Sequence, residues 1–179
     1  DTPEGVQYTD ASGQALRFQQ LVKVGPLSGQ RILDVGCGLG HLYPFLLNAC
    51  GTVDYTGIDI VPETVACATA KHSQARFFCH DLQQAPLPER FDYVLMCGVF
   101  NNAMPGAAEF LKEMVVAAFQ QCDKGVAFNF ISTQVNYRDP ELAYHDPLEV
   151  MKFCLERLTR RVAMHHHYDR CDVSVFAYR

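Results

Sequence analysis

A short apolar segment that runs directly into alternating glycines constrains the fold of this chain more than any other feature. Residues 31–35 have the length and composition of a buried strand, and Gly36, Gly38 and Gly40 follow at once. Glycines at alternate positions let the backbone turn sharply and approach a ligand closely. A helix is expected next, over residues 42–49, and it would present unpaired N–H groups at its start. This order is typical of an open α/β sheet that binds a ligand at the carboxyl ends of its strands.

Strand-like and helix-like segments alternate along the rest of the chain. The hydrophobic periodicity predicts helices over residues 10–24, 42–49, 62–72, 107–121 and 147–158, and strands over 31–35, 54–60, 76–79, 91–97, 124–131, 160–166 and 172–178. Such alternation predicts an α/β fold with a doubly wound, mostly parallel sheet of seven strands and helices on both faces. The last two strands are joined by a link too short for a crossover helix, so the last strand is expected to be antiparallel. We expect a single domain over residues 1–179.

Composition excludes several classes of protein. Hydrophobic residues make up 49% of the 179 residues and charged residues 20%, which is a normal globular balance. The net charge of −5 gives no sign of the basic surface that nucleic-acid binders usually carry, so a nucleic-acid partner is not expected. No apolar run approaches the roughly 20 residues of a membrane helix. No signal peptide is visible, although the sequence begins at Asp1 without Met, which leaves a trimmed start open.

The cysteines and histidines give no pattern of a metal site. None of the eight cysteines stands in a C-x-x-C pair, and most lie in apolar stretches. They are expected to be reduced and to pack as small hydrophobic residues, which favours a cytoplasmic location. The run His165-His166-His167 lies within a strand pattern that places His165 and His167 on one face. We expect a polar strand end there rather than a bound metal.

The spacing of the glycines discriminates between two classes of ligand. The dinucleotide fingerprint G-x-G-x-x-G would need a third glycine where His41 or Tyr43 stands. Instead, Asp34 stands two residues before Gly36. A carboxylate beside a pyrophosphate is repulsive, whereas a carboxylate beside a cationic amino-acid group is favourable. The pattern therefore favours a ligand with a cationic headgroup.

Acidic residues also end the second and third predicted strands. Asp59 lies about 20 residues past the glycine loop, where an acid can accept hydrogen bonds from both ribose hydroxyls. Asp81 follows the third strand, where a carboxylate can accept from an adenine amino group. Leu82 and Ile60 are the apolar neighbours expected beside the ring. The alternative is that these acids merely cap strand ends and turns.

With these motifs in place, the chain resembles the class I S-adenosylmethionine-dependent methyltransferases over most of its length. The first family motif corresponds to residues 34–40, the ribose-binding acid to Asp59, the adenine-contacting acid to Asp81, and the fourth-strand motif to residues 91–97. The resemblance implies that S-adenosylmethionine is the cofactor and S-adenosylhomocysteine the product. The cofactor-binding residues it implies are Asp34, Gly36, Cys37, Gly38, Gly40, Asp59, Ile60, Asp81, Leu82, Cys97 and Gly98, with Tyr8 and Arg17 as candidates that cover the cofactor.

The reaction that the resemblance implies is direct displacement at the sulfonium methyl group. Because the sulfur already activates that methyl, catalysis can come mostly from positioning two reactants and excluding water. A dedicated base is unnecessary when the acceptor is a carboxylate or is easily deprotonated. No catalytic residue is identified by a motif.

The acceptor is less constrained than the cofactor. The N/D-P-P-Y/F motif of amino-directed DNA methyltransferases is absent after residue 97, where Asn101 and Asn102 stand as candidates for an acceptor pocket or for helix capping. The connection 132–146 is long for a loop. It offers Arg138 for an anionic acceptor and His145 as a general base, with Tyr137 beside them, although ordinary surface positions are the alternative.

We expect a small-molecule acceptor. The alternatives are an RNA or protein methyltransferase and a non-catalytic protein that binds S-adenosylmethionine. An NAD-dependent oxidoreductase has only the position of Asp59 in its favour. The sequence does not identify the acceptor atom, a general base or the oligomeric state.

Overall fold

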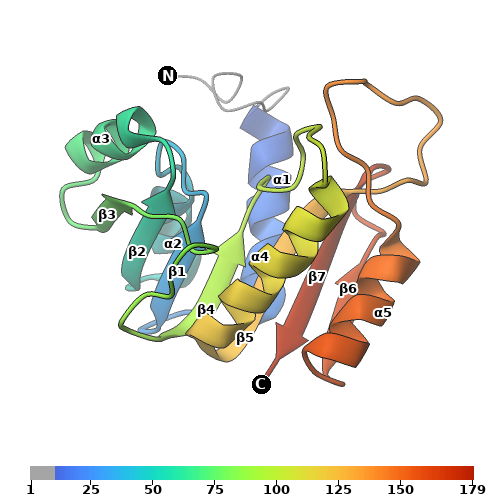
Figure 1. The fold of residues 1–179 in the computed structure, drawn as a ribbon. Coiled ribbons are helices and arrows are strands. Elements are labelled where there is room, and N and C mark those ends of the chain that lie inside the picture. Colours follow the sequence, from blue (N-terminus) through green and yellow to red (C-terminus); the bar gives the residue numbers. More distant parts are fainter. Residues whose placement is uncertain (1–10) are drawn as a thin grey trace.

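One mixed sheet organises residues 11–179, which are the residues described by the computed structural model (Figure 1). Its strand order is β3-β2-β1-β4-β5-β7-β6, and the pairings among β1 to β5 are parallel. The strands are β1 (Arg31–Val35), β2 (Asp54–Asp59), β3 (Arg76–Cys79), β4 (Phe91–Met96), β5 (Cys122–Ile131), β6 (Val162–His165) and β7 (Asp172–Tyr178). The predicted seven-stranded, mostly parallel sheet is confirmed.

The last strand enters the sheet between two others. β7 pairs antiparallel with β6, as expected, and also pairs antiparallel with β5 over its whole length. In this register Asp172, the first residue of β7, lies beside Ile131 at the carboxyl end of β5. The start of β7 therefore reaches the sheet edge at which the parallel strands end.

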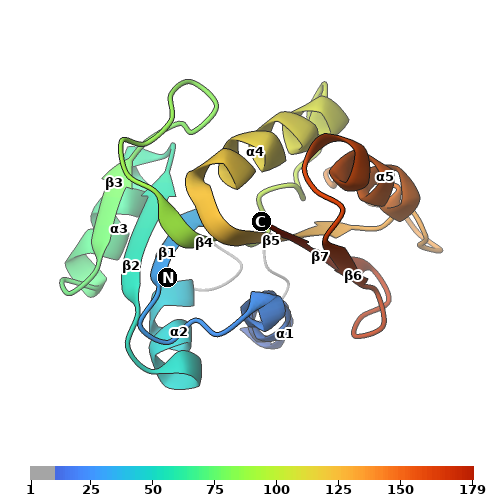
Figure 2. The same ribbon diagram turned by 90° about the horizontal axis from the view of Figure 1, so that it is seen from below.

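Helices cover both faces of the sheet, as the alternation predicted (Figure 2). α1 and α2 lie on one face and α4 and α5 on the other, while α3 packs against β2 and β3. Their bounds are α1 (Ala11–Leu21), followed by the 3-10 turn η2 (Val22–Val24), then α2 (Leu42–Cys50), α3 (Pro62–Lys71), α4 (Ala107–Gln121) and α5 (Pro147–Arg157). Within residues 11–179, no helix combines the length and hydropathy of a membrane-spanning segment.

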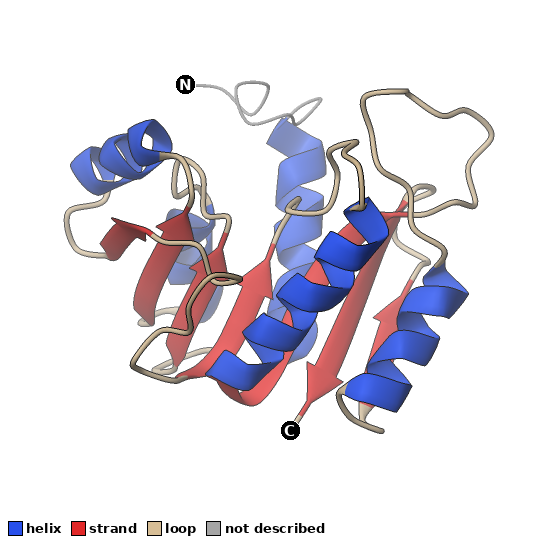
Figure 3. Ribbon diagram, in the orientation of Figure 1, coloured by secondary structure: helices blue, strands red, loops and turns tan. Residues whose placement is uncertain are grey.

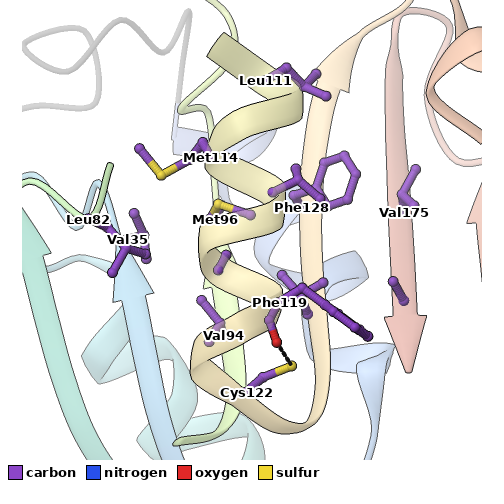
Figure 4. Packing of buried hydrophobic residues seen from close by; sticks show 14 of the residues in the cluster. Val35, Leu82, Val94, Met96, Leu111, Met114, Phe119, Cys122, Phe128 and Val175 are labelled. Atoms are coloured by element: carbon purple, nitrogen blue, oxygen red, sulfur yellow. Dashed lines mark hydrogen bonds between the residues drawn. The ribbon is translucent and has the colours of Figure 1, made fainter. Parts of the chain in front are cut away.

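The packing of α4 shows how the sequence pattern builds the core. Leu111, Met114 and Val115 recur at helical spacing and are buried against the sheet. They belong to the same buried cluster as Met96 of β4 and Phe128 of β5 (Figure 4). Because β4 and β5 are also buried on their other face, the carboxyl ends of the central strands are held in fixed positions.

The longest irregular segment joins β5 to α5. It covers residues 132–146 and forms the large loop at the upper right of Figure 3. It stands at the end of the molecule where the parallel strands finish. Asp146 ends it and caps α5, since its side chain accepts from the Leu148 and Glu149 amides.

Candidate functional site

The glycine loop after β1 has the backbone geometry that only glycine adopts without strain. The φ angles of Gly36, Gly38 and Gly40 are 72°, 50° and 75°. The Gly36 amide donates to the carbonyl of Ile58 at 2.8 Å, which ties the loop to the end of β2. A Cβ at position 36 would lie 2.7 Å from Cγ2 of Val99. The loop is therefore packed directly against the segment that follows β4.

Asp59 shapes this loop from the end of β2. One carboxylate oxygen, Oδ2, accepts from the Gly38 amide at 2.9 Å, and Oδ1 accepts from the Val61 amide at 3.0 Å. A carboxylate offers about four acceptor positions, so two further hydrogen bonds can form. Beside it, the Ile60 side chain is 67% exposed. This edge thus presents an anchored carboxylate next to an exposed apolar side chain.

Asp34 lies buried beneath the loop. The Tyr55 hydroxyl donates to its Oδ2 at 2.5 Å. Burial raises the pKa of Asp34 to about 7, the Tyr55 hydrogen bond opposes that rise, and the negative charge of Asp59 adds to it. Burial and the negative charges of Asp34 and Asp59 also raise the pKa of the Cys37 thiol. A cation placed at this point would favour the ionised form of Asp34.

Asp81 and Leu82 differ in where their side chains point. Asp81 accepts from the Gln83 amide and from Nε2 of Gln84, both at 2.9 Å, so its carboxylate closes the turn after β3. Leu82 is buried in the cluster that contains Val35 (Figure 4). Asp81 is therefore available at the sheet edge, whereas the Leu82 side chain supports that edge from inside the core.

The segment after β4 is held from two sides. Gly98 has a φ of 75°, and its amide donates to Oδ1 of Asn129 at 2.9 Å. Cys97, just before it, is half-buried against the cluster on the α1 and α2 face. On the other side, the buried Asn101 accepts at its carbonyl from the Ala143 amide at 2.8 Å. The connection 132–146 is thus docked onto this segment through backbone hydrogen bonds.

The three candidates in that connection do not come together. His145 is only 6% exposed, and its Nε2 donates to the Phe100 carbonyl at 3.1 Å. Desolvation lowers the pKa of His145. Tyr137 is 78% exposed, and the Arg138 guanidinium lies 5.4 Å from the centre of the Tyr144 ring. His145 therefore helps to hold the connection in place, while Tyr137 and Arg138 stand at its surface.

Two residues, Tyr8 and Arg17, were expected to cover the cofactor. Tyr8 lies outside the described residues. Arg17 is described, and its Nε and Nη2 both donate to Oδ2 of Asp172, at 2.8 and 2.7 Å. Asp172 also accepts from Nδ2 of Asn129 at 3.4 Å. Asn129 and Asp172 were not singled out in the sequence, although a polar residue within the apolar run of β5 was a visible signal.

The described part of the chain holds neither a cluster of metal ligands nor a disulfide. Within residues 11–179, no group of three or more His, Cys, Asp or Glu side chains is arranged to hold a metal ion. The rings of His165 and His167 are 5.4 Å apart, although β6 ends at His165 and His167 lies beyond the strand. All eight cysteines lie in the described part of the chain and are free thiols.

Comparison with known proteins gives a consistent result. A family model described as a methyltransferase domain matches residues 32–118. Rv1506c, a candidate methyltransferase of Mycobacterium tuberculosis, is 31% identical over 157 residues, covering 80% of this chain and 90% of the relative. A malonyl-acyl-carrier-protein O-methyltransferase of Acetivibrio thermocellus is 37% identical over 72 residues, or 39% of this chain. The chain matches only 25% of that enzyme's length.

Solved structures share the fold. Magnesium protoporphyrin IX methyltransferase from Synechocystis, solved with bound S-adenosylhomocysteine, aligns with a TM-score of 0.70 at 21% identity. That alignment covers 90% of this chain and 80% of the other. The PH0226 protein of Pyrococcus horikoshii aligns with a TM-score of 0.71 at 14% identity, covering 97% and 92% of the two chains.

Proposed function

Because the chain belongs to the class I S-adenosylmethionine-dependent methyltransferase family, we propose that it transfers the cofactor's methyl group to a small-molecule acceptor. The proposed cofactor site is the sheet edge formed by the glycine loop, Asp59, Asp81 and the segment after β4. The observation that carries this proposal is the glycine loop with three positive φ angles, tied to the Asp59 carboxylate through the Gly38 amide.

The residues at this edge fit the cofactor. The negative charges of Asp34 and Asp59 would favour the ammonium of an amino-acid headgroup bound at the glycine loop. Asp59 keeps acceptor capacity for ribose hydroxyls, Asp81 would accept from an adenine amino group, and the exposed Ile60 would supply an apolar contact to the ring. Because a Cβ at Gly36 would meet Val99, the backbone itself forms the wall of the site.

The chain's contribution to the reaction is positioning. When bound, S-adenosylmethionine supplies a methyl group activated by its cationic sulfur. The glycine loop and the Gly98 segment would hold one reactant, and the docked connection 132–146 would hold the other and exclude water. His145 donates its Nε2 proton to a backbone carbonyl, so an acceptor that is already ionised, such as a carboxylate, suits this site best.

Two observations support a small acceptor over a macromolecule. The net charge of −5 disfavours a long phosphate backbone. A relative that matches part of the chain is named as a fatty-acid O-methyltransferase, whose named acceptor is a small carboxylic acid. We further propose that one domain spans the chain and that it works in the reducing cytoplasm, a location that its eight free thiols suit.

A methyl-transfer screen tests this proposal. The purified protein is incubated with S-adenosylmethionine labelled in its methyl group and, in parallel, with a metabolite extract, bulk RNA and bulk protein. The proposal predicts label in the small-molecule fraction, with methyl esters of carboxylic acids enriched among the labelled products. Label confined to RNA or protein would contradict the small-molecule acceptor and favour a macromolecular substrate.

Replacing Tyr137 and Arg138 together with alanine is expected to lower kcat/KM for the labelled acceptor about tenfold, since a hydrogen bond to a charged group contributes roughly 1.5–3 kcal/mol. Affinity for S-adenosylhomocysteine should stay unchanged, because Arg138 contacts the Tyr144 ring and the Thr133 carbonyl within the connection and Tyr137 is exposed. Leu148→Ala is the matched control, since Leu148 and Tyr137 are both 78% exposed. Full activity of the double variant would show that these two residues do not bind the acceptor.

A further inference from the structure

Buried polar side chains link α1 to the Gly98 segment across the sheet. The Arg17 guanidinium donates to Asp172 at 2.8 and 2.7 Å. The other Asp172 oxygen accepts from Nδ2 of Asn129 at 3.4 Å, and Oδ1 of Asn129 accepts from the Gly98 amide at 2.9 Å. Four elements, α1, β7, β5 and the turn after β4, are therefore joined by one continuous series of hydrogen bonds.

The series lies in the interior of the protein. Asn129 and Asp172 are buried, and Arg17 is mostly covered. Removing a carboxylate from water is costly, and apolar residues in place of a buried ion pair are often neutral or stabilising. Stability alone therefore does not account for an Arg, an Asp and an Asn at these positions.

Side-chain packing connects the end of this hydrogen-bonded series to the glycine loop. Gly98 is followed by Val99, whose Cγ2 fills the space that a Cβ on Gly36 would occupy, 2.7 Å away. The position of the Gly98 amide thus sets the position of the side chain that contacts Gly36. Displacement of Asn129 would release the segment that borders the glycine loop.

We propose that Asn129 and Asp172 are positioning residues for the cofactor site. Asp172 orients Asn129 while it holds Arg17 of α1, and Asn129 fixes the Gly98 amide and hence Val99 against the glycine loop. The inference rests on the proposed cofactor site, because it assigns these residues to the alignment of that site. Arg17 acts in this account through Asp172 and not by touching the cofactor.

The test uses Asn129→Ala and the nearly isosteric Asp172→Asn in the full chain. Two properties are measured: the hydrogen-exchange rate of the Gly98 amide, and the affinity for S-adenosylhomocysteine by calorimetry well below the unfolding temperature. Asn129→Ala should speed Gly98 exchange and weaken binding about tenfold, which corresponds to the loss of one well-placed hydrogen bond. Asp172→Asn should act in the same direction with a smaller effect.

Two controls separate positioning from general destabilisation. Val126→Ala changes another buried residue of β5, in the apolar cluster on the face opposite Asn129. Asp123→Asn breaks an exposed ion pair with Arg90 at the amino end of β5. Both variants should leave Gly98 exchange and S-adenosylhomocysteine affinity as in the wild type. A loss of affinity in Val126→Ala equal to that in Asn129→Ala would overturn the positioning role.

A double variant tests the role assigned to Arg17. In the Asn129→Ala background, Arg17→Gln should weaken S-adenosylhomocysteine binding less than it does in the wild type, because the link from Asp172 to the Gly98 amide is already lost. An equal loss in both backgrounds would overturn the proposal, because Arg17 would then act independently of Asn129. Unchanged Gly98 exchange in Asn129→Ala would also overturn it. If the wild type binds no S-adenosylhomocysteine, the proposed function fails, while Gly98 exchange still decides whether the series positions this segment.

Discussion

Replacing Asp59 with alanine is expected to weaken S-adenosylhomocysteine binding about 100-fold or more, because two hydrogen bonds to a charged group contribute roughly 1.5–3 kcal/mol each. The carboxylate is proposed to accept both ribose hydroxyls. It also accepts from the Gly38 amide at 2.9 Å, so its loss releases the glycine loop as well. Both effects act on the same site and lower the affinity together.

Asp81→Ala is the matched control for this variant. Like Asp59, Asp81 accepts two local hydrogen bonds, from the Gln83 amide and from Gln84. It is proposed to accept only one hydrogen bond from the adenine, so its loss should cost about tenfold in affinity. Calorimetry on both variants measures the difference. Equal affinities of the wild type and Asp59→Ala would show that this carboxylate points away from the ligand.

Asp34→Asn is expected to remove a large pH dependence of stability. The pKa of Asp34 rises from 3.8 to about 7 on folding, mainly through burial. The folded state therefore holds this proton more tightly than the unfolded state. The stability that the protonated group provides is fully present below pH 3.8 and is lost as the pH rises through about 7. At about 1.4 kcal/mol per pKa unit, the loss is about 4 kcal/mol of unfolding free energy.

Denaturant unfolding at pH 4.5, 6 and 7.5 measures this effect. The unfolding free energy of Asp34→Asn relative to the wild type should increase steadily across that range. Tyr55→Phe keeps the ring but removes the hydrogen bond that opposes the rise in the pKa of Asp34. In this variant the loss of stability should therefore extend to higher pH. If the unfolding free energies of the wild type and Asp34→Asn changed in parallel with pH, the raised pKa of Asp34 would be contradicted.

Ligand binding should depend on the same proton. If the cofactor's ammonium lies near Asp34, the ionised carboxylate binds it better than the neutral acid. Affinity for S-adenosylhomocysteine should then increase as the pH rises through about 7, and this increase should be smaller in Asp34→Asn. A pH dependence of binding identical in both proteins would place the ammonium elsewhere.

Local sequence patterns predicted most of the fold. The predicted strand over residues 76–79 and helix over 107–121 have the bounds observed for β3 and α4. Periodicity is a local property, and it also placed Asp59 and Asp81 at the ends of neighbouring parallel strands. The insertion of β7 between β5 and β6 was not predicted, because strand order depends on pairing between distant segments.

Long-range contacts explain what the sequence did not reveal at the site. His145 looked like a general base on a surface loop. Its burial arises from pairing of the connection 132–146 with Ile131 and with the segment after β4, and irregular segments leave no periodic signal of such pairing. Likewise, the link from Asn129 to Gly98 and Asp172 joins residues far apart in the chain.

The most direct test of the account is calorimetric titration of the purified protein with S-adenosylmethionine, S-adenosylhomocysteine and NAD. S-adenosylmethionine and S-adenosylhomocysteine should bind with micromolar dissociation constants, within the usual range of cofactor affinities, and NAD should not bind. No heat with either S-adenosyl compound, together with saturable binding of NAD, would contradict it.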